Sequence, residues 1–267
     1  MGVLNVTPDS FSDGGKFSTL DTATAQAEQM ARDGADLIDI GGESTRPGSE
    51  TVGADEQIRR VVPIIQAVRK HLDIAVSIDT TLAQVAQAAL EAGADIINDI
   101  SAGLGDSAML RLAGARRVPI VLMHMQGTPR TMQQSPSYEN VVHDVTEFLQ
   151  QRIIAAQSEG IAADRILIDP GIGFGKTMEH NLTLLQRLRE LTALGRPMVV
   201  GTSRKSFIGK ITSEPDPHQR LFGTAATVAW SVANGADIVR VHDVRPMMQV
   251  VRMVTAIQHP NAEFLTA

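Results

Sequence analysis

Eight short apolar, β-branched segments recur along this chain, and each ends in polar or charged side chains. The segments are continuous apolar runs, which is typical of strands buried on both faces of a parallel sheet. One polar residue after a strand carries no information, but eight in succession indicate a ring of functional groups at one end of a barrel. The terminal groups are Asn5, Asp39 with Glu43, Asp79, Asn98 with Asp99, His124, Asp169, Ser203 with Arg204 and Lys205, and Arg240 with His242.

The apolar segments alternate with stretches of helical periodicity. We expect helices near 21–33, 58–68, 85–92, 107–115, 141–153, 179–193, 219–234 and 247–258. Alternation of strand and helix predicts an α/β fold, and eight repeats predict a (β/α)8 TIM barrel that forms a single domain over residues 1–267. The expected strands are Gly2–Val6, Asp36–Ile40, Ile74–Ile78, Asp95–Asp99, Pro119–Met123, Arg165–Asp169, Met198–Gly201 and Asp237–Val241.

The connections differ in length at the two ends of these strands. A Gly-Ala-Asp tripeptide closes three helices and leads directly into a strand, at positions 34–36, 93–95 and 235–237. The connections that follow strands one, two and five are longer and rich in Gly, Pro and Ser. Long loops at the carboxyl ends of the strands favour function at that face. A doubly wound open sheet is the competing architecture, but it binds at one switch point and needs no polar group after nearly every strand.

The composition limits the classes of function. The 267 residues suit one barrel of about 250 residues, and the 3% aromatic content leaves a core of branched aliphatics. The net charge of −6 and the lack of a Lys/Arg-rich run predict no nucleic-acid partner. The absence of cysteine excludes disulfides and thiolate metal sites. With no recognisable signal peptide and no apolar run of membrane-spanning length, we expect a cytoplasmic protein with no membrane partner.

Two acids and an amide at strand ends indicate a ligand. Asp79 and Asp169 each end an apolar run, and a carboxylate buried alone costs several kcal/mol, so each needs a donor or a cation. A structural salt bridge or a helix cap would satisfy one such acid. Together with Asn98, however, the pair favours a shared heterocycle with amidine-like N–H edges.

Cations gather after the last two strands. Lys205 and Arg204 follow strand seven, and Arg240 and His242 follow strand eight, where barrels most often bind phosphate. A solvated surface pair would explain one arginine. Four such groups on adjacent strand ends favour a phosphate or diphosphate site.

Several familiar motifs are incomplete. The Gly175-Lys176-Thr177 segment resembles the end of a P-loop, but Pro170 stands where its first Gly belongs. The seven histidines lack zinc-site spacing, whereas Asn5 and Asp39 are hard oxygen donors that suit Mg²⁺ beside a diphosphate. His124 is either a base or a structural histidine.

In these segments the chain resembles the dihydropteroate synthase family over essentially its whole length. The matching motifs are Asn5 to Gly15, Gly41 to Gly48, Asn98-Asp99-Ile100, Leu122 to Gly127, Asp169 to Lys176, Ser203 to Ser206 and Arg240 to Asp243. The resemblance implies a homodimeric (β/α)8 barrel that joins p-aminobenzoate to 6-hydroxymethyl-7,8-dihydropterin diphosphate and releases diphosphate in folate biosynthesis. It also implies that sulfonamides compete with p-aminobenzoate.

The resemblance implies a role for each matching residue, and Mg²⁺ as the cofactor. The implied catalytic residues are Asp79, Lys205, Arg240 and His242. The implied pterin contacts are Asp79, Asn98, Met123, Asp169, Phe174, Gly201 and Lys205. Asn5, Arg240 and His242 are implied to bind the diphosphate, with Asn5 also a metal ligand. The implied p-aminobenzoate pocket and its loops consist of Phe11, Thr45, Arg46, Pro47 and Ser203.

Two departures and two rival functions remain. The family usually has a stretch before the first strand, whereas here the strand begins at Gly2, and Thr80-Thr81-Leu82-Ala83 replaces a common Thr-Ser-Lys-Pro. We expect the second change to be neutral. A methyltetrahydrofolate-dependent methyltransferase would share the pterin acids but would not need Thr45-Arg46-Pro47. A non-catalytic pterin-binding or phosphate-binding protein would not need the long loops.

Overall fold

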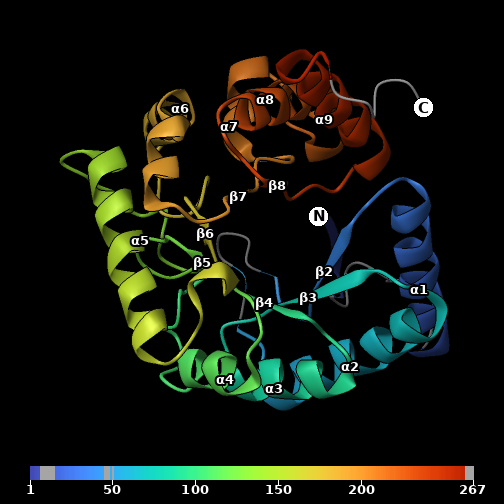
Figure 1. Ribbon diagram of the computed structural model, residues 1–267. Helices are drawn as coiled ribbons and strands as arrows, with labels where there is room; N and C mark the ends of the chain where they lie inside the picture. The colour runs from blue at the N-terminus through green and yellow to red at the C-terminus, as the bar shows by residue number, and fades with distance from the viewer. Residues whose placement is uncertain (7–15, 45–48, 50, 262–267) are drawn as a thin grey trace.

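Eight parallel strands lie at the centre of the structure and helices surround them (Figure 1). The computed structural model describes residues 1–6, 16–44, 49 and 51–261. Every predicted strand is present, although most are one or two residues shorter than expected. They are β1 (Gly2–Asn5), β2 (Leu37–Gly41), β3 (Ala75–Asp79), β4 (Ile96–Asp99), β5 (Ile120–Met123), β6 (Ile166–Asp169), β7 (Val199–Val200) and β8 (Ile238–Val239).

The strands close into a ring. Strands β1 to β6 pair in chain order, and β7 pairs with β8. Parallel bridges join Ile168 to Met198 and Gly2 to Val241, so β6 reaches β7 and β8 reaches β1. Backbone bonds support the second junction, because Val3 N donates to the carbonyl of Val241 at 3.0 Å. A closed ring of eight parallel strands is the predicted TIM barrel and not the open sheet.

The helices follow the expected alternation, with three differences. The first helix begins at Lys16, the segment 179–193 divides into α6 and the 3₁₀ helix η3, and the short helix α7 was not predicted. An Arg187–Glu190 ion pair at 2.7 Å suits η3, because residues i and i+3 eclipse in a 3₁₀ helix. The α-helices are α1 (Lys16–Arg32), α2 (Ala54–His71), α3 (Ala83–Ala92), α4 (Met109–Arg116), α5 (Val141–Ser158), α6 (Met178–Gln186), α7 (Ser206–Thr212), α8 (Leu221–Ala233) and α9 (Val244–Gln258), and the 3₁₀ helices are η2 (Ala163–Arg165), η3 (Leu188–Leu194) and η4 (Pro217–Gln219).

Strand side chains alternate between two apolar clusters, one outside the ring and one inside it. Outward residues such as Ile40, Ile78 and Leu122 belong to the large core between strands and helices. Inward residues form a smaller cluster near the amino ends of the strands, consisting of Met1, Leu37, Ala75, Ile96, Val121, Leu167, Val199 and Ile238. Each strand contributes one member or, for β1, the residue before it. This apolar layer fills the lower barrel and is the floor on which the polar groups lie.

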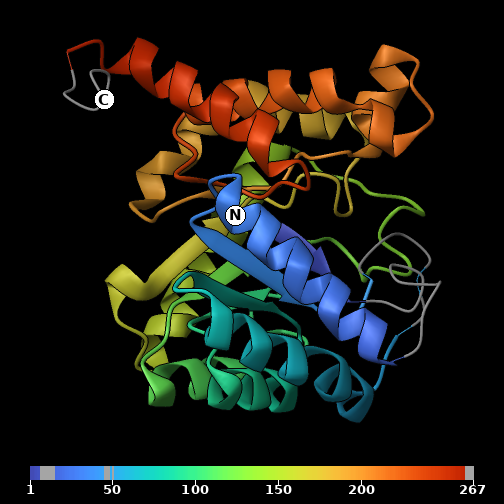
Figure 2. The ribbon, with the colours of Figure 1, turned by 90° about the vertical axis from the view of Figure 1, so that its right-hand side faces the viewer.

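The barrel is seen from the side in Figure 2, with α1 nearest the viewer and α8 and α9 at the top. Gly34, Gly93 and Gly235 have φ of 98°, 112° and 97°, which confirms that the repeated tripeptide closes helices through a left-handed glycine. Within the described ranges, no helix combines the length and the apolar character needed to cross a bilayer.

Candidate active site

Five of the seven predicted pterin residues face the barrel interior, together with Arg240, whereas Phe174 and Lys205 lie in the loops after β6 and β7. Asn98, Met123, Asp169, Gly201 and Arg240 each follow an inward apolar residue by two positions, and side chains two apart on a strand share a face. Asn5 and Asp79 lie one step further along the same inward faces. Apolar groups thus fill the lower barrel and polar groups its carboxyl end, where barrel active sites lie.

Arg240 is the centre of a buried ion network. Its Nε donates to Asp39 Oδ2 at 2.7 Å, and its Nη2 donates to Asp79 Oδ2 at 2.8 Å. The same oxygen of Asp39 accepts a bond from Asn98 Nδ2 at 3.1 Å. Asp39 is 0% exposed. The network therefore fixes one face of Arg240, Asp79 and Asn98 before any ligand binds.

Burial shifts the protonation of this network. It raises the pKa of Asp79 to about 7, although Arg240 acts in the opposite direction. Burial alone would lower the pKa of Arg240, but Asp39 and Asp79 raise it above its ordinary value. The arginine therefore keeps its charge, while Asp79 titrates near neutral pH.

Asp169 and Lys205 face the network from the other side of the barrel. Asp169 Oδ1 accepts a bond from Gly171 N at 2.7 Å, and burial raises the pKa of this carboxyl. The Lys205 ammonium lies 4.0 Å from the centroid of the Phe174 ring. Burial and then Arg240 lower the pKa of Lys205 to about 8. The structure thus brings acid, cation and aromatic ring together at the carboxyl ends of β6 and β7.

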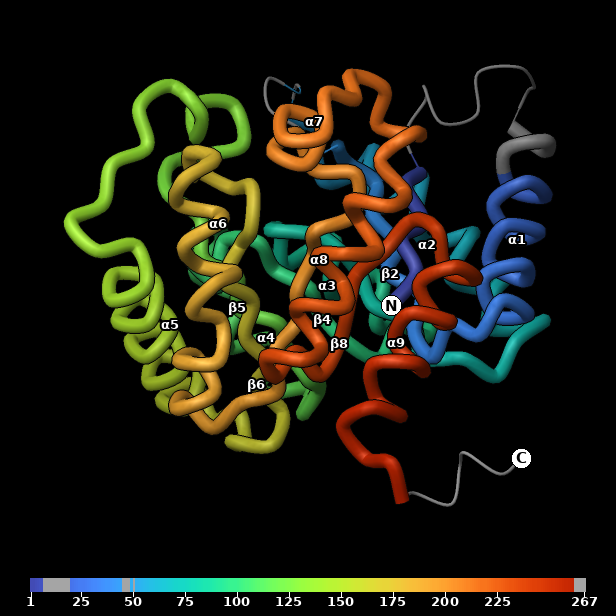
Figure 3. The backbone as a smooth tube through the Cα atoms, turned by 90° about the horizontal axis from the view of Figure 1, so that it is seen from above, coloured from blue at the N-terminus to red at the C-terminus, as the bar shows by residue number. Residues whose placement is uncertain are grey.

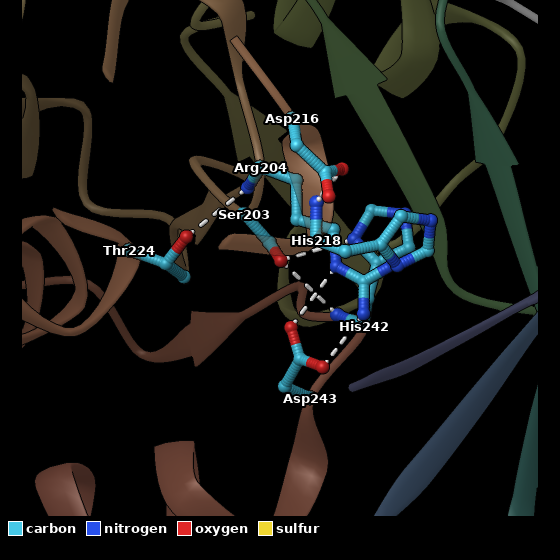
Figure 4. A network of polar contacts seen from close by, with 7 residues as sticks. All are labelled: Ser203, Arg204, Asp216, His218, Thr224, His242 and Asp243. Carbon is cyan, nitrogen blue, oxygen red and sulfur yellow. Dashed lines mark hydrogen bonds and ion pairs between the residues drawn. The ribbon is translucent and has the colours of Figure 1, made fainter. Parts of the chain in front are cut away.

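Strand ends seven and eight form a second polar network, drawn in Figure 4. Ser203 Oγ accepts from the backbone N of His242 at 3.2 Å and lies 3.0 Å from its Nδ1. Ser203 has no other bond among the described residues, so its O–H is satisfied only when Nδ1 accepts. Burial, then Arg204 and Arg240, lower the pKa of His242 to about 3. The neutral ring therefore carries its proton on Nε2 and is a donor there.

Arg204 differs from the other cations expected at the phosphate site. Its Nε and Nη2 bind both oxygens of Asp243, at 3.0 and 2.7 Å, and its Nη1 lies 3.1 Å from His218 Nδ1 (Figure 4). Its φ of 61° is in the left-handed region, which is uncommon for a residue other than glycine. A bidentate carboxylate offsets its charge, so we assign Arg204 to fixing the loop and not to anion binding.

Three of the polar strand-end residues serve the scaffold. Glu43 Oε1 accepts from Val52 N at 2.9 Å and its Oε2 from Gln57 at 3.0 Å, which ties the second loop to α2. Asp99 Oδ2 accepts from Gly103 N at 2.6 Å and caps a turn. His124 lies outside the ring, with its imidazole 4.8 Å from the Phe148 ring, so the structural alternative is favoured.

The predicted p-aminobenzoate loops are only partly described. Phe11, Thr45, Arg46 and Pro47 lie outside the described residues. Ser203 is 5% exposed and adjoins His242, which places this member of the set beside the expected diphosphate residues.

The described residues offer few oxygen ligands for Mg²⁺. No cluster of three His, Asp or Glu residues suits a metal in the part of the chain that the structure describes. Asp39 Oδ2 accepts from Arg240 and Asn98, whereas its buried Oδ1 has no hydrogen-bond partner among the described residues, so one oxygen of Asp39 stays free for the ligand role expected beside Asn5. Asn5 is half-buried at the end of β1, and its side chain makes no hydrogen bond within the described ranges. One amide oxygen at the mouth fits an ion held mainly by substrate phosphates and water.

Sequence reasoning missed two residues of the site region. Asp39 was expected only as an oxygen donor for Mg²⁺ beside Asn5, and its ion pair with Arg240 and its bond from Asn98 were not predicted. Lys176 was noted only within a failed P-loop motif, yet it is 2% exposed, and the following Thr177 caps α6. A lysine directly before a helix cap gives no sequence signal of burial.

Comparisons with known proteins agree with this geometry. The family model of pterin binding enzymes matches residues 1–242. Dihydropteroate synthase of Synechocystis is 52% identical over 96% of this chain and 89% of its own length. A crystal structure of the Xanthomonas albilineans synthase with 4-aminobenzoic acid has a TM-score of 0.91 at 44% identity, covering 97% of this chain and 92% of that one.

The Xanthomonas albilineans synthase in complex with 7,8-dihydropteroate has a TM-score of 0.87 at 41% identity, again over 97% of this chain and 92% of that one. These matches favour the synthase over the methyltransferase and the non-catalytic alternatives. The chain belongs to the pterin binding enzyme family and, within that family of transferases, to the dihydropteroate synthases.

Proposed function

We propose that this enzyme joins p-aminobenzoate to 6-hydroxymethyl-7,8-dihydropterin diphosphate and yields 7,8-dihydropteroate and diphosphate. The observation that carries the proposal is the inward polar layer, in which Asp79, Asn98 and Asp169 lie at the carboxyl end of the barrel above an apolar floor. The relatives solved with 4-aminobenzoic acid and 7,8-dihydropteroate support the two halves of the product.

The polar layer suits the pterin heterocycle. Asp79 and Asp169 are acceptors for the amidine-like N–H groups of the pterin, and Asn98 offers both donor and acceptor. Phe174 and Lys205 are already stacked on one another and give the ring an apolar face with a donor at its edge. Met123 and Gly201 complete the wall, Met123 by its soft side chain and Gly201 by leaving room for the ring.

Diphosphate binds on the opposite side of the same layer. Arg240 Nε and Nη2 donate to Asp39 and Asp79, and its Nη1 has no partner among the described residues. His242 presents Nε2–H, and Asn5 adds an amide at the end of β1. These donors converge on an anion while Asp39 and Asp79 hold the arginine in place.

The reaction proceeds by dissociation. The bond between the pterin methylene carbon and the diphosphate oxygen breaks with its electrons on oxygen, and the electron-rich pterin delocalises the positive charge left on carbon. Arg240 and His242 stabilise the departing anion, and ionised Asp79 stabilises the cation. The arylamine then bonds to carbon and loses one proton to solvent or diphosphate, so no strong base is needed.

Mg²⁺, held by Asn5 and the diphosphate oxygens, would supply further neutralisation of the leaving group. The residues that close the arylamine pocket, Phe11, Thr45, Arg46 and Pro47, belong to the proposal through family resemblance. Ser203 would contribute by its position beside His242.

We also propose that two copies associate through α8 and α9. These helices lie side by side on the face seen in Figure 3. They expose large apolar side chains, of which Phe222 is 87% exposed and Trp230 49% on α8, and Met253 59% and Ile257 68% on α9. An apolar surface of this kind on a barrel helix pair is typical of a homodimer interface.

The reaction is tested by turnover of the purified protein. We expect equal amounts of diphosphate and 7,8-dihydropteroate, and only with both substrates and Mg²⁺ present. A sulfonamide should raise the apparent KM for p-aminobenzoate and leave kcat unchanged. Diphosphate release that is indifferent to p-aminobenzoate would refute the synthase activity.

A further inference from the structure

Lys176 is a buried cation that the proposed reaction does not use. It lies in the loop between β6 and α6 and is 2% exposed. Its Nζ is 2.9 Å from His124 Nδ1, 3.0 Å from the Gly171 carbonyl and 3.0 Å from the Phe174 carbonyl. An ammonium has three N–H donors, so these short contacts use all of them.

Burying this charge is costly. No carboxylate lies within ion-pair distance of Lys176 among the described residues, and an ammonium out of water costs several kcal/mol. Burial lowers its pKa to about 7, while Asp169 at longer range opposes the shift and Lys205 adds to it. A methionine of similar length would fill the space without this cost, so the contacts and not the volume account for a lysine here.

His124, which follows β5, is the side-chain acceptor for the Lys176 ammonium. Burial and then Lys176 lower the pKa of His124 to about 3, so its imidazole is neutral. Because Nδ1 accepts from Lys176, the ring hydrogen is on Nε2. This histidine therefore anchors the ammonium without taking part in proton transfer.

The loop that Lys176 holds packs closely against the β5–α5 loop. Gly171 and Gly175 have φ of 66° and 59°, and a Cβ would lie 1.8 Å from the His124 carbonyl oxygen at Gly171 and 2.3 Å from the Gln126 carbonyl oxygen at Gly175. The Gly175 carbonyl accepts from Tyr138 OH at 2.6 Å. Glycine is therefore needed where the β6–α6 loop passes the β5–α5 loop, and the bonds from Lys176 and Tyr138 hold the two loops together.

The same loop carries two pterin residues. Gly171 N donates to Asp169 Oδ1 at 2.7 Å, and Phe174 places its ring 4.0 Å from Lys205 Nζ. Lys176 bonds the carbonyls of Gly171 and Phe174, one on each side of the turn. Whatever fixes these two carbonyls also fixes the orientation of the acid and of the ring.

We propose that Lys176 is a positioning residue for the pterin site, because its ammonium joins His124 to the carbonyls of Gly171 and Phe174 and so holds Phe174 in the orientation that receives the pterin. The proposal rests on the proposed function, since it requires the pterin to bind this wall. It predicts an effect on pterin affinity and not on p-aminobenzoate.

The first test is Lys176→Met, with Lys210→Met on exposed α7 as the matched control. We expect the dissociation constant for 6-hydroxymethylpterin, measured by calorimetry, to rise about tenfold in Lys176→Met, as for loss of hydrogen bonds from a charged donor. The KM for p-aminobenzoate should stay within about twofold, and the control should match the unmodified protein. Unchanged pterin affinity in Lys176→Met would overturn the proposal.

A double-mutant cycle separates positioning from general loosening of the fold. If Lys176 acts through Phe174, Lys176→Met should cost less than about twofold in pterin affinity once Phe174→Leu has removed the ring. An equal loss in both backgrounds would contradict the proposal. Pterin that binds normally to a protein without turnover would refute the proposed reaction alone, so the two failures are distinguishable.

A second variant covers the case in which Lys176→Met does not fold. Tyr138→Phe removes only the bond to the Gly175 carbonyl of the same loop, from a half-buried position. We expect a loss of roughly threefold in pterin affinity. In the Phe174→Leu background this loss should vanish, and its persistence there would count against loop positioning.

Discussion

At the scale of single residues, Asp169 gives the sharpest prediction. Asp169→Asn keeps the shape of the side chain but removes the charge that accepts a pterin N–H. We expect pterin binding by calorimetry to fall by between about tenfold and a hundredfold, with the melting temperature little changed. The matched control is Asp164→Asn, at an exposed position in η2. Full pterin affinity in Asp169→Asn would contradict the assigned role.

A second residue-scale prediction concerns pH. Asp79, whose pKa burial raises to about 7, accepts a pterin N–H more strongly when ionised, so pterin affinity should rise as pH increases through 7. Lys205, whose pKa is lowered to about 8, donates best when protonated, so affinity should fall above that pH. We expect a maximum between the two values in binding titrations, with a shallower rise on the acid side because the Lys176 ammonium, whose pKa is about 7, is lost over the same range.

The control for the alkaline side is Lys205→Arg, because an arginine keeps its charge over this range. In that variant the fall in pterin affinity above pH 8 should disappear while the acid side remains. A flat profile from pH 6 to 9 in the unmodified protein would show that neither group governs binding.

At the scale of elements, the ion network between β2, β3 and β8 predicts a stability effect. Arg240→Ala leaves Asp39 and Asp79 buried without a cation, and breaking a buried pair costs about 3 kcal/mol. We expect that fall in the free energy of unfolding at pH 8 by chemical denaturation. Arg245→Ala, on the exposed side of α9, should show no such change.

The loss should be smaller at pH 5. The folded-state pKa of Asp79 is raised above its unfolded value, so its contribution to stability is fully present below the unfolded pKa and is lost as pH rises through about 7. Protonated Asp79 needs no cation, which lowers the cost of removing Arg240. An equal loss at both pH values would show that the charge of Asp79 does not change between pH 5 and pH 8, which would contradict a pKa of about 7.

The strands were easier to predict from the sequence than the short helices. All eight strands were predicted because their short continuous apolar runs alternate with stretches of helical periodicity, as in a parallel sheet buried on both faces. Helix α7 was missed because seven residues are too few for a helical period to show. The break between α6 and η3 was missed because Arg187 and Glu190 suit both helix types.

The positions of the site residues at the strand ends were predictable, but the ion pairs and hydrogen bonds between them were not. Side chains alternate between the two faces of a strand. This alternation places Asn98 and Asp169 inside the barrel and Asp99 and His124 outside it. Sequence alone does not tell that Asp39 and Asp79 share one arginine, because the residues are 201 and 161 positions from Arg240. The burial of Lys176 likewise depends on a loop from another part of the chain.

At the scale of the whole molecule, the apolar surface of α8 and α9 predicts assembly. We expect light scattering during size exclusion to give twice the mass of a 28.6 kDa chain. Phe222→Glu should shift the protein to the monomer mass, because it introduces a charge into an apolar interface. Glu147→Gln, on the exposed surface of α5, is the control. A monomer mass for the unmodified protein would contradict the proposed association through α8 and α9.

The central claim is that the inward polar layer above the apolar floor is the pterin site. A crystal structure of the protein with 6-hydroxymethylpterin and diphosphate tests it most directly. We expect the pterin N–H groups within hydrogen-bond distance of Asp79 and Asp169, the ring against Phe174, and the diphosphate at Arg240 and His242. Pterin bound outside the barrel mouth, with Asp79 and Asp169 making no contact to it, would contradict the account.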